Sequence, residues 1–226
     1  MVNRPVVLVH GWGGSFESTW RSSGLVDLLT DIGREVIGVD LLGHGSAPRP
    51  HDPNDYSDLT ARILDTIGDR PVDAVGFSLG AMTLLRTAIE HPSSFSKLVL
   101  AGIGKNVIEP RDEVAHERLV AALEGRGDPD DNIGRLFVQY ADSTGNDRVA
   151  LTAIMKRPSQ PFDPHQFRRV SAETLVVIGD KDFAGPGDPL AAALPNARLV
   201  TLRNCDHFAT TENFGFFDAV LDFLTN

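Results

Sequence analysis

The chain has 226 residues, enough for one domain with a sizeable core, and its composition, 42% hydrophobic and 23% charged, is ordinary for a soluble globular protein. Its formal net charge of −10 argues against general affinity for nucleic acid or an anionic membrane surface. The single cysteine, Cys205, excludes an internal disulfide, and the N-terminal apolar run at 6–9 is too short for a signal peptide or a membrane span. We therefore expect a cytoplasmic monomer or homodimer without nucleic-acid or membrane partners.

Short β-branched segments alternate with longer amphipathic segments along most of the chain. Six near-continuous apolar runs have the length of strands that are buried on both faces of a parallel sheet. These runs cover residues 5–10, 35–40, 72–77, 97–103, 174–180 and 197–202. Helices are predicted between them over 24–32, 56–68, 79–92 and 212–224. The alternation predicts a doubly wound α/β sheet, in which ligands bind beyond the carboxyl ends of the strands.

The alternation is interrupted once, between residues 103 and 174. This interval contains no predicted strand, and it is too long for a simple crossover connection. Its helical stretches lie around 112–124, 131–142, 147–156 and 163–170. We expect a core formed by 1–104 and 172–226, with a helical cap, 105–171, inserted over the active site.

Ser78 lies in the pentapeptide GFSLG, directly after a predicted strand and directly before a predicted helix. The G-x-S-x-G pattern alone has a high false-positive rate, but a strand–turn–helix context is what a nucleophilic serine of this type requires. The turn is strained, and glycines at 76 and 80 allow the backbone segments to approach closely. The position therefore favours Ser78 as a nucleophile over Ser78 as a turn residue.

A serine hydroxyl needs a base that removes its proton, and that base needs an acidic partner. His207, in NCDHF, follows the last predicted strand and belongs at the same sheet edge as Ser78. The other histidines lie on polar or helical segments or in His-Gly pairs, where structural hydrogen bonding is favoured. Asp180 and Asp182 both follow the preceding predicted strand. The residue pattern does not choose between these two carboxylates.

A glycine-rich loop, HGWGG at 10–14, follows the first predicted strand. Its backbone can turn amide groups toward an oxygen that gains negative charge, which is the role of an oxyanion hole. We predict the N–H groups of Trp12 and Leu79 as the donors. A phosphate-binding loop is disfavoured because neither G-x-x-x-x-G-K-[ST] nor G-x-G-x-x-G is present there. We find no metal-ligand cluster, and we expect no cofactor.

The motifs HGWGG, GFSLG, GDKD and DHF, together with DLLGHGSA at 40–47, resemble those of the α/β-hydrolase superfamily. The resemblance covers nearly the whole chain. The resemblance implies an α/β-hydrolase fold with about six mostly parallel strands, flanked by helices and carrying a small helical cap. It also implies a triad of Ser78, His207 and Asp182, because the family's G-x-x-D pattern matches 179–182.

The sequence departs from the family pattern at two places. We expect the first strand to lead directly to the oxyanion loop, without the two strands that usually come before it in the family. Asp206 stands before the base histidine, where glycine is common. Serine at position 78 disfavours the members with an aspartate nucleophile, the haloalkane dehalogenases and epoxide hydrolases.

The resemblance implies a serine hydrolase that cleaves a small carboxylic ester or a related acyl compound, such as a thioester, through an acyl-enzyme. The same triad in the superfamily also serves carbon–carbon bond hydrolysis, lyase chemistry and cofactor-free peroxidase chemistry, and some members are ligand-binding receptors with residual activity. The motifs do not separate these alternatives, because the cap selects the substrate.

Two groups of residues in the expected cap bear on the substrate. Apolar side chains line a pocket or pack the cap onto the sheet: Leu136, Phe137, Val138, Tyr140, Leu151, Ile154 and Met155. Basic side chains bind an anionic substrate or are solvated surface charges, the second interpretation being favoured: Lys156, Arg157, Arg168 and Arg169.

Overall fold

A single six-stranded sheet lies at the centre of the computed structural model, which describes residues 4–226. All neighbouring strands are parallel, and their order is β2-β1-β3-β4-β5-β6. The strands are β1 (Val6–Val9), β2 (Val36–Val39), β3 (Val72–Phe77), β4 (Phe95–Ala101), β5 (Glu173–Gly179) and β6 (Ala197–Leu202). The six predicted strands and the predicted fold class are confirmed.

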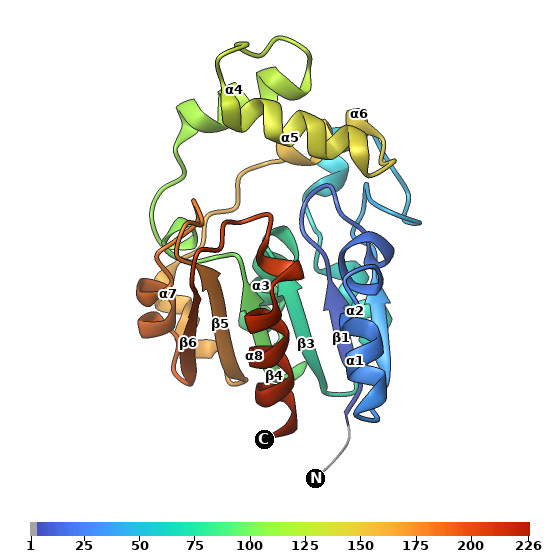
Figure 1. Cartoon of the computed structure of the whole chain (residues 1–226), viewed down its shortest axis with the longest axis vertical. Coiled ribbons are helices and arrows are strands. Elements are labelled where there is room, and N and C mark those ends of the chain that lie inside the picture. The colour runs from blue at the N-terminus through green and yellow to red at the C-terminus, as the bar shows by residue number, and fades with distance from the viewer. Residues whose placement is uncertain (1–3) are drawn as a thin grey trace.

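Helices cover both faces of this sheet (Figure 1). They are α1 (Leu25–Asp31), α2 (Ala61–Ile67), α3 (Leu79–Glu90), α7 (Asp188–Ala193) and α8 (Phe214–Thr225). Buried residues of α1 and α8 pack on one face, and those of α2, α3 and α7 pack on the other. The sheet is therefore the middle of three layers, which explains why its strands are near-continuous apolar runs.

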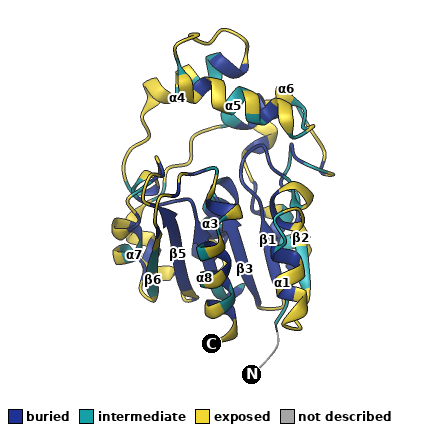
Figure 2. Cartoon of the chain, in the orientation of Figure 1, coloured by how far each residue is buried: buried dark blue, intermediate teal, exposed yellow. Residues whose placement is uncertain are grey.

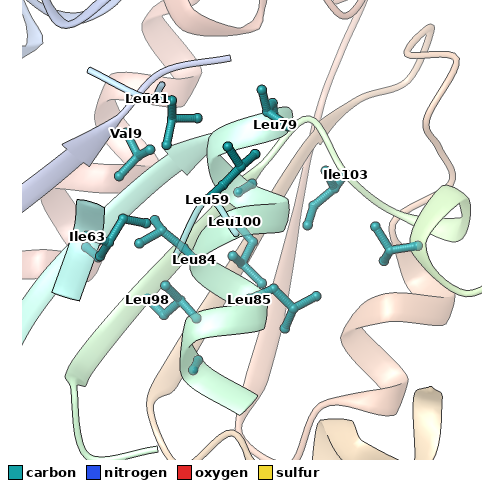
Figure 3. Packing of buried hydrophobic residues seen from close by; sticks show 14 of the residues in the cluster. Val9, Leu41, Leu59, Ile63, Leu79, Leu84, Leu85, Leu98, Leu100 and Ile103 are labelled. Carbon is teal, nitrogen blue, oxygen red and sulfur yellow. The ribbon is translucent and has the colours of Figure 1, made fainter. Parts of the chain in front are cut away.

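Side chains of each strand alternate between two hydrophobic clusters. Val7 and Val9 of β1 pack with α3, whereas Val6 and Leu8 pack with α1 and α8. Figure 3 shows the α3 side of the core, where leucines of α3 and β4 pack together: Leu84, Leu85, Leu98 and Leu100. Each such buried side chain contributes about 2 kcal/mol to folding. The two clusters hold the carboxyl ends of the strands in a fixed register.

Two helices differ from the sequence predictions for local reasons. Helix α2 begins at Ala61 rather than near residue 56, because the Asp58 carboxylate accepts the N–H groups of Thr60 and Ala61 at 2.8 and 3.3 Å. Helix α7 was not predicted, since Pro186 and Pro189 break the apolar pattern there. Pro189 lies in the first turn, where a helix loses no hydrogen bond to proline.

Three helices lie beyond the carboxyl ends of the strands, opposite the C-terminus (Figure 1). They are α4 (Glu113–Leu123), α5 (Asn132–Ser143) and α6 (Arg148–Met155), and the fourth predicted helix is a 3-10 turn, Pro164–Arg169. Much of α4 and α5 is exposed, while β1, β3 and nearly all of β5, inside the sheet, are buried (Figure 2). The division into a core and a cap at 104/105 and 171/172 stays a prediction. No helix within residues 4–226 is long and apolar enough to cross a membrane.

Candidate active site

Ser78 occupies the tight turn between β3 and α3. Its backbone φ of 50° and ψ of −112° lie in a region that residues with a side chain rarely adopt. The Ser78 N–H donates to the Ala101 carbonyl at 2.8 Å, and the Ser78 carbonyl accepts the first helical bond from Met82 at 2.9 Å. These bonds on both sides of the residue hold the strained turn, which places the hydroxyl at the carboxyl edge of the sheet.

The two glycines of the pentapeptide allow α3 to lie directly against neighbouring backbone. A Cβ atom on Gly80 would overlap the carbonyl oxygens of Val9 and His10, at the end of β1. A Cβ atom on Gly76 would lie 2.8 Å from the Ala81 nitrogen. The small residues therefore bring the start of α3 into contact with the loop that follows β1.

His207 connects Ser78 with Asp182 through hydrogen bonds on both ring nitrogens. His207 Nε2 lies 3.0 Å from Ser78 Oγ, and Nδ1 lies 2.9 Å from both carboxylate oxygens of Asp182. Asp182 also accepts the Ala184 N–H at 2.8 Å. Asp182 therefore orients the ring as the Nδ1–H tautomer, which leaves Nε2 free to accept the proton of Ser78.

Asp180, the other carboxylate after β5, lies away from His207. Its carboxylate is exposed and accepts the Cys205 N–H at 3.1 Å. Hydrogen bonding from the Asn204 backbone lowers the pKa of Asp180, and the Cys205 bond acts in the same direction. The turn from Gly179 to Asp182, closed by a 3.2 Å backbone bond, carries Asp182 back toward the histidine. Of the two carboxylates that the pattern left open, only Asp182 contacts the ring.

The N–H groups of Trp12 and Leu79 are available at the same edge. Neither donates to another protein group among residues 4–226. Leu79 is the first residue of α3, so its N–H has no acceptor inside the helix. A Cβ atom on Gly11 would lie 3.4 Å from Ser78 Cβ, which shows that the HGWGG loop runs directly beside the serine.

A small cavity of about 40 Å³ opens beside Ser78 and His207. Its walls are the aromatic side chains of Trp12, Phe77, Phe137, Tyr140 and Phe208, together with Thr19 and Thr211. Within residues 4–226, no three His, Cys, Asp or Glu side chains are grouped so that they could hold a metal ion. The site thus combines a hydrogen-bonded serine with a narrow, mostly aromatic cavity.

Aromatic rings surround the imidazole of His207. The ring centroids of Phe183, Phe77 and Phe208 lie 4.3, 4.9 and 5.8 Å from that of His207. Phe183, whose ring lies against the imidazole, is itself 53% exposed, while the His207 residue is only 5% exposed. The apolar surroundings strengthen the electrostatic interaction between His207 and Asp182.

The expected cap supplies only part of the cavity wall that the sequence suggested. Phe137 and Tyr140 line the cavity. Leu151 and Ile154 are fully buried in the core, and Leu136 is 46% exposed. The remaining two of the seven apolar residues, Val138 and Met155, are partly buried and pack against the core cluster.

None of the four basic residues singled out in the sequence lines this cavity. Lys156 forms an exposed ion pair with Glu124 at 2.9 Å. Arg157 donates to the Ile154 carbonyl at 2.7 Å, and Arg168 and Arg169 are exposed. The interpretation as surface charge fits Lys156, Arg168 and Arg169.

Asn146, between α5 and α6, ties the helical segment to the HGWGG loop and was not found from the sequence. Its side-chain amide donates to the carbonyls of Gly13 and Gly14 at 2.7 and 3.2 Å. Its amide oxygen accepts the Gly45 N–H at 2.8 Å, and the Trp12 indole donates to the Leu151 carbonyl at 3.0 Å. Asparagine is common in loops, so no local signal marks this contact.

Known proteins resemble this chain in sequence and in fold. A family model described as alpha/beta hydrolase fold matches residues 4–122, which is more than half of the chain. A 2-hydroxy-6-oxononadienedioate/2-hydroxy-6-oxononatrienedioate hydrolase of Pseudomonas putida is 26% identical, over 98% of this chain and 88% of its own. A pimeloyl-[acyl-carrier protein] methyl ester esterase of Neisseria meningitidis is 28% identical, over 90% of this chain and 86% of its own.

Solved structures show the same architecture. The enol-lactonase from Burkholderia xenovorans LB400 superposes with a TM-score of 0.77 at 23% identity, covering 99% of this chain and 92% of its own. At that identity the likeness concerns the fold. The family match, together with the hydrolases among its relatives, identifies the chain as a member of the alpha/beta hydrolase fold family and as an enzyme of the α/β-hydrolase type.

Proposed function

We propose that this protein is a serine hydrolase that cleaves a small carboxylic ester, or a related acyl compound, through an acyl-enzyme on Ser78. The observation that carries the proposal is the continuous hydrogen-bonded chain from Ser78 through His207 to Asp182. Ser78 and His207 line a cavity, and within residues 4–226 the N–H groups of Trp12 and Leu79 donate to no protein group. Nucleophile, base, orienting acid and oxyanion donors are the four parts that acyl transfer to serine requires.

In the first half of the reaction, Ser78 Oγ attacks the carbonyl carbon while its proton passes to His207 Nε2. The carbonyl oxygen gains negative charge and accepts hydrogen bonds from the N–H groups of Trp12 and Leu79. Asp182 stabilises the imidazolium through its 2.9 Å contacts with Nδ1. His207 then returns the proton to the leaving oxygen, and the alcohol departs.

In the second half, a water molecule attacks the acyl-enzyme by the same route. His207 removes a proton from the water, and the new oxyanion occupies the same pair of N–H donors. Collapse of this intermediate breaks the bond to Ser78 Oγ, which recovers its proton from His207. The acid leaves, and the enzyme returns to its starting state without any external reactant other than water.

The relative from N. meningitidis, named as a methyl ester esterase, supports an ester substrate for this chain. The relative from P. putida supports a second candidate, because its named substrate is a 2-hydroxy-6-oxo acid with a ketone carbonyl. In that case Ser78 would attack a ketone, and the bond broken would be carbon–carbon. Lyase chemistry, peroxidase chemistry and a receptor role remain alternatives with the same site.

The test is hydrolysis of short p-nitrophenyl esters by the wild-type protein and by Ser78→Ala. Removing the nucleophile is expected to lower kcat by about 10⁴-fold or more. Ser171→Ala is the matched control, because that hydroxyl is exposed and bonds only the Pro92 carbonyl. It is expected to keep full activity.

A fluorophosphonate probe gives a second readout that needs no correct choice of ester. Covalent labelling is expected on the peptide that contains Ser78 in the wild-type protein and to be lost in Ser78→Ala. Undiminished ester hydrolysis by Ser78→Ala contradicts the role of the serine. Turnover of a β-diketone without turnover of any ester would favour carbon–carbon cleavage instead.

A further inference from the structure

Three hydroxyl groups from distant parts of the chain line the cavity beside Ser78 and His207. Thr19 lies in the π-helical turn Phe16–Arg21, which follows β1. Tyr140 lies in α5, and Thr211 lies in the turn Thr210–Glu212, which follows β6. The two threonine residues are largely buried, with exposed fractions of 7% and 8%. The mechanism described above uses none of these three groups.

Within residues 4–226, none of the three hydroxyl groups forms a hydrogen bond with another protein group, in contrast to other buried threonines. Thr83 and Thr87 donate to carbonyl groups one turn earlier in α3, at 2.8 and 2.9 Å. In the described part of the chain, the fully buried side-chain polar atoms without a partner are Trp20 Nε1 and His44 Nε2, so the three hydroxyl oxygens are accessible rather than enclosed. Three open hydroxyl groups on one cavity therefore indicate where a polar part of a ligand is bound.

Two of these hydroxyl groups converge at one point of the HGWGG loop. A Cβ atom on Gly14 would lie 2.5 Å from Thr19 Oγ1 and 3.4 Å from the Tyr140 hydroxyl oxygen. Any side chain at position 14 would therefore occupy the space between them. Glycine at this position therefore leaves room for the two hydroxyl groups.

The charges around the cavity select a neutral ligand group. No lysine or arginine is among its lining residues, which all belong to the described part of the chain. Burial raises the pKa of Tyr140, and the negative charge of Glu212 raises it further. The tyrosine hydroxyl consequently stays protonated and donates, while a carboxylate placed here would meet Glu212 without a cation to pair with.

The size of the cavity limits this ligand group. An enclosed water needs about 10–15 Å³ by the same measure, so a cavity of about 40 Å³ admits a group of only a few non-hydrogen atoms. Four further aromatic residues, Trp12, Phe77, Phe137 and Phe208, form the rest of the wall together with Ser78 and His207. The ligand group is thus small and partly apolar, with an oxygen that accepts hydrogen bonds.

We infer that Thr19, Tyr140 and Thr211 form a subsite for a neutral oxygen group of the ester substrate, such as an ether, ketone or hydroxyl oxygen close to the scissile carbonyl, and that this subsite rejects a carboxylate. The inference rests on the proposed function, since it names the substrate class of the same site. A subsite for a neutral group would give this chain a different substrate class from relatives whose named substrates are dioates.

Three methyl esters with acyl groups of similar size test the subsite. Methyl methoxyacetate carries an ether oxygen where methyl butyrate has a methylene group, and monomethyl malonate carries a carboxylate. Values of kcat/KM from acid release are divided by the rate constants of hydroxide-catalysed hydrolysis, which removes differences in intrinsic reactivity. We expect the corrected kcat/KM to be highest for methyl methoxyacetate, about tenfold lower for methyl butyrate, and lowest for monomethyl malonate.

Thr19→Val, Tyr140→Phe and Thr211→Val remove one hydroxyl each. Every variant is expected to lower the methoxyacetate-to-butyrate ratio by about three- to tenfold, the usual effect of one hydrogen bond. Thr66→Val is the control, because Thr66 is exposed on α2 and bonds only the Arg62 carbonyl. It is expected to leave the ratio unchanged. A constant ratio in all three cavity variants, or a preference for malonate, overturns the inference.

Binding to Ser78→Ala gives the same comparison without turnover. Trp12 lines the cavity, so its fluorescence reports binding of the intact methyl esters, and methoxyacetate is expected to bind more tightly than butyrate. If the wild-type protein hydrolyses no ester and no fluorophosphonate labels Ser78, the proposed function fails. The binding order then still decides whether the three hydroxyl groups form the subsite. Equal affinity for the two esters in every variant contradicts it.

Discussion

Asn146 donates a 2.7 Å hydrogen bond to the Gly13 carbonyl, across 133 positions of the sequence. The bond joins the connection between α5 and α6 to the loop that carries the Trp12 N–H. Because the same side chain also accepts the Gly45 N–H at 2.8 Å, three segments meet at one amide group. The helical segment is therefore tied to the loop that carries the Trp12 N–H, one of the two proposed oxyanion donors.

Asn146→Asp keeps the acceptor for Gly45 but removes the donor for Gly13 and Gly14. We expect kcat to fall about tenfold or more with a smaller change in KM, because displacing an oxyanion donor affects the transition state more than the bound substrate. Steady-state kinetics with one ester measures this split. Asn132→Ala, at an exposed residue of α5, is the control, and an unchanged kcat in Asn146→Asp would contradict the role of the bond.

Asp182 and Asp180 lie two residues apart, yet only Asp182 contacts His207. Asp182→Asn is expected to lower kcat by about 10⁴-fold at neutral pH, because the amide no longer holds the Nδ1–H tautomer or stabilises the imidazolium. Asp180→Asn removes a similar charge from the same loop and is expected to keep kcat within a few-fold of the wild type. Equal losses in the two variants would argue against Asp182 as the orienting acid.

His10 of the HGWGG loop and His44 of the 40–47 loop form a buried pair with ring centroids 4.9 Å apart. His10 Nδ1–H donates to the Gly11 carbonyl at 2.7 Å, and Nε2 accepts the Leu41 N–H at 3.1 Å, so this ring is neutral. His44 Nδ1–H donates to the Leu42 carbonyl at 3.0 Å. Burial lowers the pKa of both histidines, that of His44 to about 3.

This pair predicts a loss of stability in mild acid. Below pH 6.5 the unfolded chain binds a proton at His44 that the folded protein does not bind, so stability falls as the pH falls toward 3. The contribution of His44 is about 1.4 kcal/mol per pH unit below 6. Urea unfolding at pH 7, 6 and 5 measures the slope, and His44→Asn is expected to reduce it by that amount. A wild-type slope no steeper than that of the variant would contradict the neutral buried histidine.

Gly80 lies at a point where α3 contacts the carbonyl groups of Val9 and His10. Gly80→Ala is therefore expected to destabilise the protein by about 3 kcal/mol, although the same change in an open helix stabilises by about 1 kcal/mol. Gly24→Ala is the control, since its φ is +88° and nothing lies near its Cβ position. It is expected to cost only about 1 kcal/mol of backbone strain. Chemical unfolding measures both, and a stabilised Gly80→Ala protein would contradict the close packing.

Arg34 and Asp73 form a buried ion pair at the amino ends of the strands, with 2.5 Å between Arg34 Nη2 and Asp73 Oδ2. Arg34 also donates to the carbonyls of Arg4 and Leu224, which links both ends of the described chain to β3. Asp73→Ala leaves the guanidinium buried without its partner and is expected to cost about 3–5 kcal/mol.

The exposed pair between Arg21 and Glu17 provides a comparison for this buried pair. Glu17→Ala is expected to cost less than about 1 kcal/mol, because solvent screens the charges. Urea unfolding of the two variants under identical conditions measures the difference. Similar small losses in both would show that the buried pair is replaceable.

The sequence by itself determined the strands, most of the core helices and the positions of Ser78 and His207 at the carboxyl edge of the sheet. Strands buried on both faces must be apolar at every position, and a nucleophilic turn needs small residues around the serine. Both requirements act over a few neighbouring residues and so leave local patterns. Helix α7 escaped prediction because Pro186 and Pro189 obscure its pattern.

Only the tertiary structure decided which side chains meet at the site. The residue pattern left Asp180 and Asp182 equivalent, and only the family resemblance favoured Asp182, which the turn after β5 brings to His207. Thr19, Tyr140 and Thr211 share one cavity, and Asn146 reaches Gly13, because the helical segment packs over the strand ends. Such contacts join residues far apart in the chain, and each side chain involved is ordinary in its local context. Their meeting depends on how the layers pack, which no short stretch of sequence encodes.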